Sequence, residues 1–200
     1  MLKTCLAGLL AGLSSLTATA QVLCALGPGA VSYKASADQR PSSDALQLAG
    51  RVNAALKTIC GPQCPTMALF RNPTAPNAML IVDAGQAKLV YSPQFFAAAY
   101  DKFGDAGILA IVAHELGHAL DDTLGAAWIK SSWTPELRAD AWAGCVLAKL
   151  DPATLGLGAL SRYPAAAGPG WNVRLPVLRD GYLQCGGAAA KFDAQNQRGR

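Results

Sequence analysis

The chain has little charge and no extended run of basic residues. Only 15% of its 200 residues are Asp, Glu, Lys or Arg, whereas 52% are hydrophobic, which excludes an intrinsically disordered chain. Its 17 Lys and Arg are scattered, which argues against a nucleic-acid-binding surface. Beyond the amino terminus, no apolar stretch approaches the ~20 residues that a membrane-spanning helix needs. Length and composition therefore favour one domain with its own hydrophobic core.

Residues 1–20 have the three parts of a secretory signal peptide in the expected order. Lys3 supplies a positive start, an apolar stretch follows it, and Ala18-Thr19-Ala20 is a small-x-small cleavage site. The alternative is an uncleaved anchoring helix, but the apolar run is short for a bilayer. We therefore expect export to a periplasmic or extracellular space, with a mature chain that begins at Gln21 and has no stable membrane span.

An exported chain enters an oxidising environment, in which cysteines mostly form disulfides. The mature chain keeps five cysteines, so one is left over; they are Cys24, Cys60, Cys64, Cys145 and Cys185. We hypothesise that Cys60 pairs with Cys64 across a tight turn. Cys145 and Cys185 would then attach the carboxy-terminal segment to a helix. A structural zinc site at Cys60 and Cys64 is the rival hypothesis, but a second ligand pair at suitable spacing is missing.

Hydrophobic spacing and turn signals predict one compact domain over residues 21–185. Helices are expected over 44–60, 93–103, 106–124 and 135–150, and strands over 66–71, 78–83 and 87–91, with a tight turn at 84–85. Residues 21–40 are weakly patterned, and 152–185 are rich in loop-forming residues. Residues 186–200 are expected to form a flexible polar tail.

One five-residue motif holds both histidines of the chain and one of its two glutamates: His114-Glu115-Leu116-Gly117-His118. Positions i and i+4 of a helix share a face, so the two imidazoles can bind one Zn²⁺. Glu115 can reach a water on that metal, as the general base of a metalloprotease site does. The alternative is a buried helix with satisfied histidines, but burying these groups without a metal is costly. Gly117 is unfavourable inside a helix and indicates a close approach by another group.

A catalytic zinc site needs a third protein ligand. The chain has no third histidine, and its cysteines are expected in disulfides, so we expect a carboxylate. Glu136, the other glutamate, follows His118 by 18 residues. Asp140 lies one turn further and can accept the free ring N–H of a ligand histidine, most directly His114. Two alternatives stay open: Asp140 as the direct ligand, and Glu136 as a favourable charge at a helix N-terminus. Manganese, iron or cobalt could occupy the same site.

The two motifs together resemble the gluzincins, zinc metallopeptidases with a glutamate ligand, and most of all the bacterial neutral zinc metallopeptidases. The close match covers about residues 105–150, and its second motif consists of Glu136, Ala139, Asp140, Ala143 and Gly144. The resemblance implies an α+β, zincin-like fold, with a small sheet beside the motif helix and a second helix that carries the glutamate ligand. It also implies His114, His118 and Glu136 as zinc ligands, Glu115 as the catalytic base, and a peptide or protein substrate.

The resemblance further implies a strand that borders the cleft and to which an extended substrate adds; residues 87–91 are the candidate. Many relatives have a histidine shortly before the segment that corresponds to residues 174–185 of this chain. At that place this chain has Gly170-Trp171-Asn172. The residue that stabilises the oxyanion is therefore open. The candidates, each also explained by packing or surface charge, are Tyr163, Arg174, Arg179 and Tyr182. Two other functions stay open: a zinc-stabilised, non-catalytic binding or chaperone module, and zinc-dependent hydrolysis of a non-protein substrate.

Overall fold

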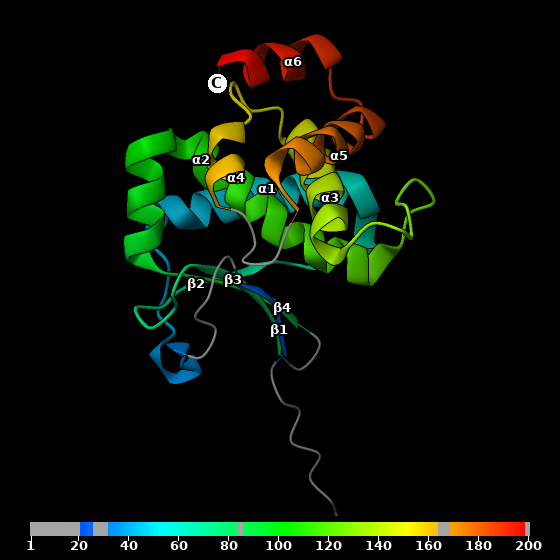
Figure 1. Ribbon diagram of the computed structural model, residues 1–200. Helices are drawn as coiled ribbons and strands as arrows, with labels where there is room; N and C mark the ends of the chain where they lie inside the picture. The colour runs from blue at the N-terminus through cyan, green and yellow to red at the C-terminus, as the bar shows by residue number, and fades with distance from the viewer. Residues whose placement is uncertain (1–20, 26–31, 84–85, 164–168, 199–200) are drawn as a thin grey trace, which may run out of the picture.

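The computed structural model describes residues 21–25, 32–83, 86–163 and 169–198 (Figure 1). The expected signal peptide and the expected turn at 84–85 lie outside these ranges. A four-stranded sheet lies against a layer of helices, which confirms the predicted α+β class. The long helix α2, Pro93–Leu124, carries the histidine motif and packs on the strands β3, Ala78–Asp83, and β4, Gln86–Tyr91.

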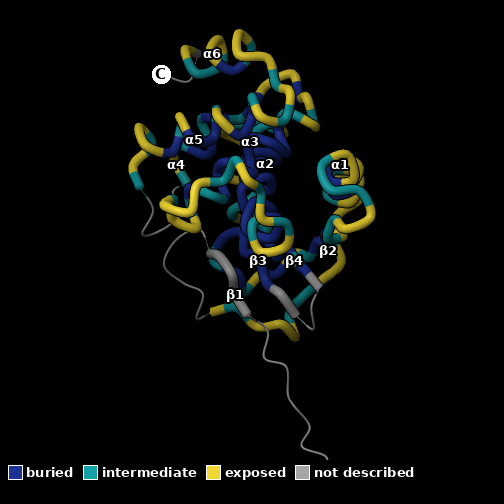
Figure 2. Tube along the Cα trace, turned by 90° about the vertical axis from the view of Figure 1, so that its right-hand side faces the viewer, coloured by how far each residue is buried: buried dark blue, intermediate teal, exposed yellow. Residues whose placement is uncertain are grey.

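The strands lie side by side in the order β1, β3, β4, β2 (Figure 2). β3 pairs antiparallel with both β4 and β1, Gln21–Ala25, whereas β2, Ala68–Arg71, pairs parallel with β4. The three predicted strands are confirmed, and β1 is an additional strand in the weakly patterned segment 21–40. The predicted role of residues 87–91 at the sheet edge is wrong. Because β3 and β2 pair with the two sides of β4, this strand has no free edge for a substrate.

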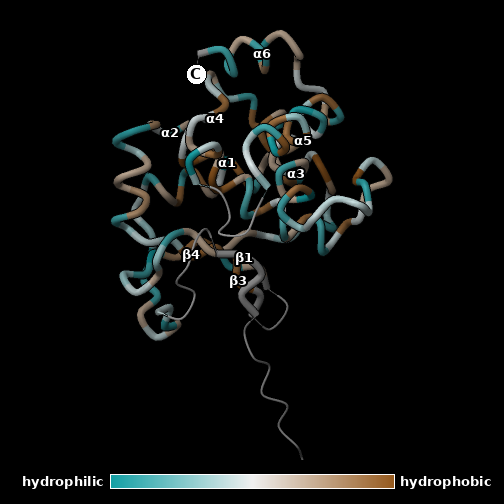
Figure 3. Tube along the Cα trace, viewed as in Figure 1, coloured by the Kyte–Doolittle hydropathy of each residue, from teal (hydrophilic) through white to brown (hydrophobic). Residues whose placement is uncertain are grey.

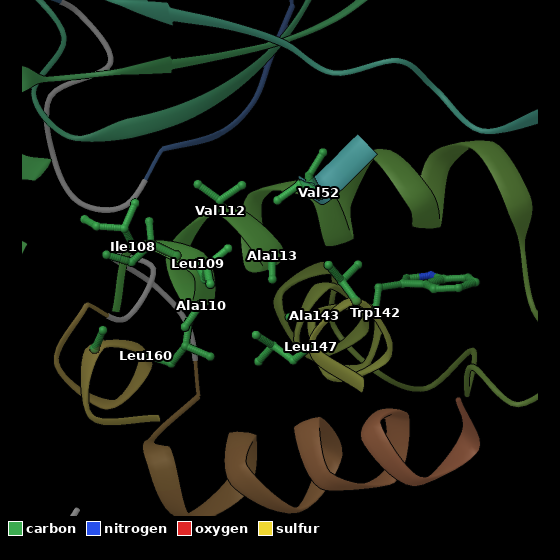
Figure 4. Close-up of a cluster of buried hydrophobic side chains, with 14 of the residues drawn as sticks. Val52, Ile108, Leu109, Ala110, Val112, Ala113, Trp142, Ala143, Leu147 and Leu160 are labelled. Carbon is green, nitrogen blue, oxygen red and sulfur yellow. The ribbon is translucent and has the colours of Figure 1, made fainter. Parts of the chain in front are cut away.

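Side-chain caps mark the starts of three predicted helices: α1, Ser43–Cys60, α2, and α3, Pro135–Leu150. The hydroxyls of Ser42, Ser92 and Thr134 accept hydrogen bonds from backbone N–H groups of the first turns. Within α2, Gly104 has a φ of 61°, so the element consists of two helical segments, as the sequence predicted. The main hydrophobic core lies between the second segment and the helices around it (Figure 4).

The carboxy-terminal third is more helical than predicted. The loop-rich interpretation of 152–185 is wrong, because this stretch forms α4, Leu157–Arg162, and α5, Trp171–Gln184. Pro176 removes only one backbone donor from α5, and burial of apolar side chains such as Leu178 outweighs that loss. Where a flexible tail was expected, α6 spans Ala189–Arg198. Phe192 of α6 is buried, and its ring centroid lies 5.4 Å from that of Tyr182.

Glycines allow the backbones of α2, α3 and α5 to approach closely. A Cβ on Gly117 would overlap the carbonyl oxygen of Ala139, so α2 and α3 touch inside the histidine motif itself. Gly144 meets the backbone of α5 in the same way, and Gly181 meets the backbone of α3. The prediction that Gly117 marks a close approach is therefore confirmed. Hydrophobic stretches lie where these helices meet, and the outer turns are hydrophilic (Figure 3).

Both expected disulfides are present. Cys60–Cys64 closes a short loop after α1, which includes the 3-10 turn η3, Gly61–Gln63, and Cys145–Cys185 joins α3 to the residue that follows α5. Two disulfides suggest an extracytoplasmic location. Among the helices that the structure describes, none is long and apolar enough to cross a membrane.

Candidate metal centre

The structure brings three potential metal ligands together from two helices. His114 and His118 lie on the second segment of α2, and Glu136 is the second residue of α3. One ligand atom from each residue lies within 4.8 Å of the other two. The group is a buried site of the His-Glu-x-x-His type that could hold a metal ion.

The Glu136 carboxylate faces both imidazole rings. Its Oε2 is 3.2 Å from Nε2 of His114, and its Oε1 is 3.7 Å from Nε2 of His118. The two ring planes meet at 86°, with centroids 5.2 Å apart. Two nitrogens and one carboxylate thus converge on a small volume, as helical i and i+4 spacing allows.

The placement of Glu136 follows from how α3 begins and where it touches α2. Thr134 caps the helix, and Pro135 occupies its first position, so Glu136 lies in the first turn. Gly117 receives the backbone of Ala139, which brings that turn alongside the two histidines. Asp121, near the end of α2, accepts a 2.6 Å hydrogen bond from Nε of Arg138 in this first part of α3 and adds a polar contact between the two helices.

Asp140 links the site to a buried arginine. Its Oδ1 is 2.9 Å from Nδ1 of His114, the contact that the sequence predicted. Arg174 of α5 donates to both carboxylate oxygens, through Nε to Oδ2 at 2.7 Å and through a terminal nitrogen to Oδ1 at 2.8 Å. The other terminal nitrogen donates to the carbonyl oxygen of Leu160. Because Asp140 has these partners, it acts on Nδ1 of His114 and leaves Nε2 directed at Glu136.

Arg174 was considered as an oxyanion-stabilising residue, and the structure gives its guanidinium a different set of contacts. Its side chain is 1% exposed, and every contact above is internal to the protein. The other three candidates also have packing or pairing partners. Arg179 pairs with Asp193, Tyr182 packs on Phe192, and Tyr163 packs on Phe95. Sequence spacing contains no signal for the Arg174–Asp140 pair, because the two residues meet only through the packing of α3 on α5.

Glu115 points from α2 toward the sheet. Its Oε2 accepts a hydrogen bond from the backbone N–H of Leu80 in β3, at 3.2 Å. Its Oε1 is buried and has no hydrogen-bond partner among the described residues. The carboxyl group is 0% exposed, and this burial raises its pKa to about 8. The positive charge of His114 and the Leu80 hydrogen bond oppose the rise, and the negative charge of Glu136 adds to it.

The other titratable groups of the site are shifted so that they can act as ligands. Burial, followed by the nearby charge of His114, lowers the pKa of His118 to about 4, so its imidazole is neutral at pH 7. Burial alone would raise the pKa of Glu136, but the hydrogen bond and charge of His114 outweigh it and hold that pKa below its ordinary value. Metal ligands must be neutral imidazoles and ionised carboxylates, and these are the forms that the shifts favour for His118 and Glu136.

The donor set and its unsatisfied atoms fit a metal ion. Nε2 of His118 is buried without a hydrogen-bond partner within the described part of the chain, as is Oε1 of Glu115. Buried polar atoms of this kind are costly unless a partner satisfies them. Two imidazole nitrogens and one carboxylate oxygen are a common ligand set for catalytic zinc.

Comparison of the chain with protein-family models, with curated proteins and with solved structures finds no match. The functional assignment therefore rests on the geometry of the site and on the motif resemblance.

Proposed function

We propose that the chain is an exported zinc metalloendopeptidase. One observation carries the proposal: His114, His118 and Glu136 converge while the adjacent Glu115 keeps one buried carboxylate oxygen without a hydrogen-bond partner in the described structure. A site built only to bind metal does not need this second carboxylate beside the ligands. A hydrolytic site needs it, because an attacking water must lose a proton.

Each residue has a distinct role in this proposal. His114, His118 and Glu136 would hold Zn²⁺, which when bound polarises a carbonyl group and makes a coordinated water more acidic. The Leu80 N–H fixes Oε2 of Glu115 and leaves Oε1 to accept a proton from the attacking water and donate it to the leaving amine. Asp140, held by Arg174, would keep His114 in the tautomer that carries its proton on Nδ1, so that the lone pair of Nε2 can coordinate metal.

Cleavage of an unfolded protein tests the proposal. Purified chain should cleave casein with zinc present, and a chelator should abolish cleavage. Glu115→Gln should still bind about one zinc per chain but cleave nothing, since the amide cannot accept the proton. Asp122→Asn, which changes an exposed carboxyl near the end of α2, is the control and should cleave as wild type does. Appreciable casein cleavage by Glu115→Gln would refute the role of Glu115.

A zinc-stabilised binding module is the second candidate, and the burial of the reacting groups favours it. Glu115 is fully buried and His118 is 8% exposed, so a substrate cannot reach them without movement of the protein. In this case wild type would bind zinc, Glu136→Ala would lose it, and neither protein would cleave casein.

A further inference from the structure

The sheet offers an extended peptide only one position beside Glu115. The backbone N–H of Leu80 donates a hydrogen bond to Glu115, the proposed general base. The middle of β3 is therefore the part of the sheet nearest the reaction centre. The inner side of β3 pairs with β4 from Ala78 to Asp83. A peptide that adds to the sheet at this point must therefore pair with the outer side of β3.

In this structure β1 already pairs with that outer side. It runs antiparallel to β3, with Gln21 opposite Val82 and Ala25 opposite Met79. The register shifts between Val22 and Cys24, opposite Ile81 and Leu80. The irregular point of the β1–β3 pairing thus coincides with the residue whose N–H holds Glu115.

The burial of the site is consistent with the position of β1 on the outer edge of β3. Glu115 and His114 are fully buried, and the side chain of Glu136 is 21% exposed. β1 also contacts α2, which carries His114, Glu115 and His118, so this edge strand of the sheet lies against the helix of the site.

We propose that β1 is an internal inhibitor of this protein: it occupies the outer edge of β3 in place of an extended peptide and so blocks access to the site. The inference rests on the proposed function and adds a regulatory element to it, because β1 competes with a peptide that would pair with β3 through backbone hydrogen bonds. Binding then requires β1 to leave β3.

Displacement of β1 is physically accessible. The strand has five residues and pairs with β3 on one side only. In the mature chain expected from the cleavage site it is also terminal, and terminal segments open at low free energy. If only a fraction of molecules has β1 displaced, the apparent affinity for peptide falls by that fraction, so weakening β1 must tighten binding.

Proline in β1 tests the proposal, because it removes a backbone donor and resists strand pairing. We would measure binding of a fluorescently labelled casein fragment to the metal-free full chain, where cleavage does not interfere. Val22→Pro should bind at least about 10-fold more tightly than wild type. Ala189→Pro, at the exposed first position of α6 where proline is tolerated, is the control and should bind as wild type does. Equal affinity in a Val22→Pro chain whose residues 21–25 have lost their amide-exchange protection would overturn the proposal.

A second measurement keeps the proposal testable if Val22→Pro fails to fold, as judged by its circular dichroism. Amide hydrogen exchange of the wild-type chain should show that casein deprotects residues 21–25 while 78–83 stay protected by the incoming peptide. Retained protection of 21–25 at saturating casein would overturn the proposal.

Adding zinc to the same proteins separates this inference from the proposed function. Tighter binding by Val22→Pro without casein cleavage by any variant would support the peptide-binding edge and refute the peptidase. Cleavage by wild type with unchanged affinity in Val22→Pro would support the peptidase and refute the role of β1.

Discussion

The histidines of α2 lie between two parts of the fold that are held in different ways: a helical wall formed by α3 and α5, and a sheet wall formed by β3. On one side, α3 and α5 meet α2 through glycines, and the chain of contacts from His114 through Asp140 to Arg174 is buried. The Cys145–Cys185 disulfide ties the same two helices together. On the other side, β3 packs on α2, and among the described residues its hydrogen bond to the site is the one from the backbone N–H of Leu80 to Glu115.

This difference matches two tasks. Metal ligands need fixed positions, which close backbone packing and hydrogen bonds to the ligands provide. A general base and its substrate need space that can open, which a wall with few polar contacts provides. The helical wall would thus serve metal binding, and the sheet wall would serve the entry of substrate.

Gly117→Ala should have the largest effect, because it separates the helical wall from α2. The new Cβ would overlap the backbone of Ala139, which cannot move aside as a flexible side chain can. We expect a loss of roughly 3 kcal/mol in the free energy of unfolding, together with much weaker zinc binding. Urea denaturation and metal titration would measure both.

Gly50→Ala is the matched control for that substitution. Gly50 is an exposed residue of α1, and a Cβ there would meet no atom within 4 Å. The variant should be more stable by about 0.5–1 kcal/mol, since alanine favours the helix. Equal stability of the two variants would mean that α2 and α3 do not need the close contact at Gly117.

Asp140→Asn should have an intermediate effect on the ligand His114. The neutral amide pairs poorly with the buried guanidinium of Arg174 and no longer fixes the tautomer of His114. We expect zinc affinity to fall about 10–100-fold in a chain that still folds. Competition with a chromogenic chelator would measure the affinity, and unchanged affinity would show that Asp140 does not orient His114.

The pH dependence of the metal-free protein should show the smallest effect, and it reports on the sheet wall. The pKa of Glu115 is raised to about 8 by burial, so the folded state keeps a proton that the unfolded chain releases at lower pH. Stability from this group is complete at low pH and falls as pH rises through 8. His118, with its pKa lowered to about 4, acts oppositely but only below about pH 6.5.

Between pH 6.5 and 8 the metal-free chain should therefore lose roughly 1 kcal/mol of unfolding free energy per pH unit. Urea denaturation across this interval would measure the loss. Glu115→Gln has no carboxyl to titrate and should give a flat profile. A wild-type profile as flat as that of the variant would contradict the burial of a protonated Glu115.

The two walls also differ in how far the sequence predicted them. The helical wall follows from local signals: the i and i+4 histidines, the Thr134-Pro135 start of α3, and Gly117 inside a helix. These features act within one or two turns, so spacing predicts them. Glu136 was the only glutamate left to join them.

The sheet wall and the carboxy-terminal helices depend on contacts between distant segments. β1 gains its conformation from pairing with β3, which lies more than 50 residues away in the sequence, and its own residues are weakly patterned. Helix α6 has one buried aromatic residue, Phe192, among polar neighbours, so its hydrophobic signal is a single side chain. Pro176 favoured a loop where packing on α3 stabilises a helix. Local pattern could not predict these outcomes, because tertiary packing decides them.

The metal content of the purified chain tests the central claim most directly. Wild type, Glu136→Gln and the control Asp122→Asn would be loaded with zinc, dialysed and measured by mass spectrometry, with folding checked by circular dichroism. The account predicts about one zinc per chain in wild type and in Asp122→Asn, and a strongly reduced content in Glu136→Gln, which has lost its carboxylate ligand. A folded wild type without zinc, or Glu136→Gln with as much zinc as wild type, would contradict the three-residue site.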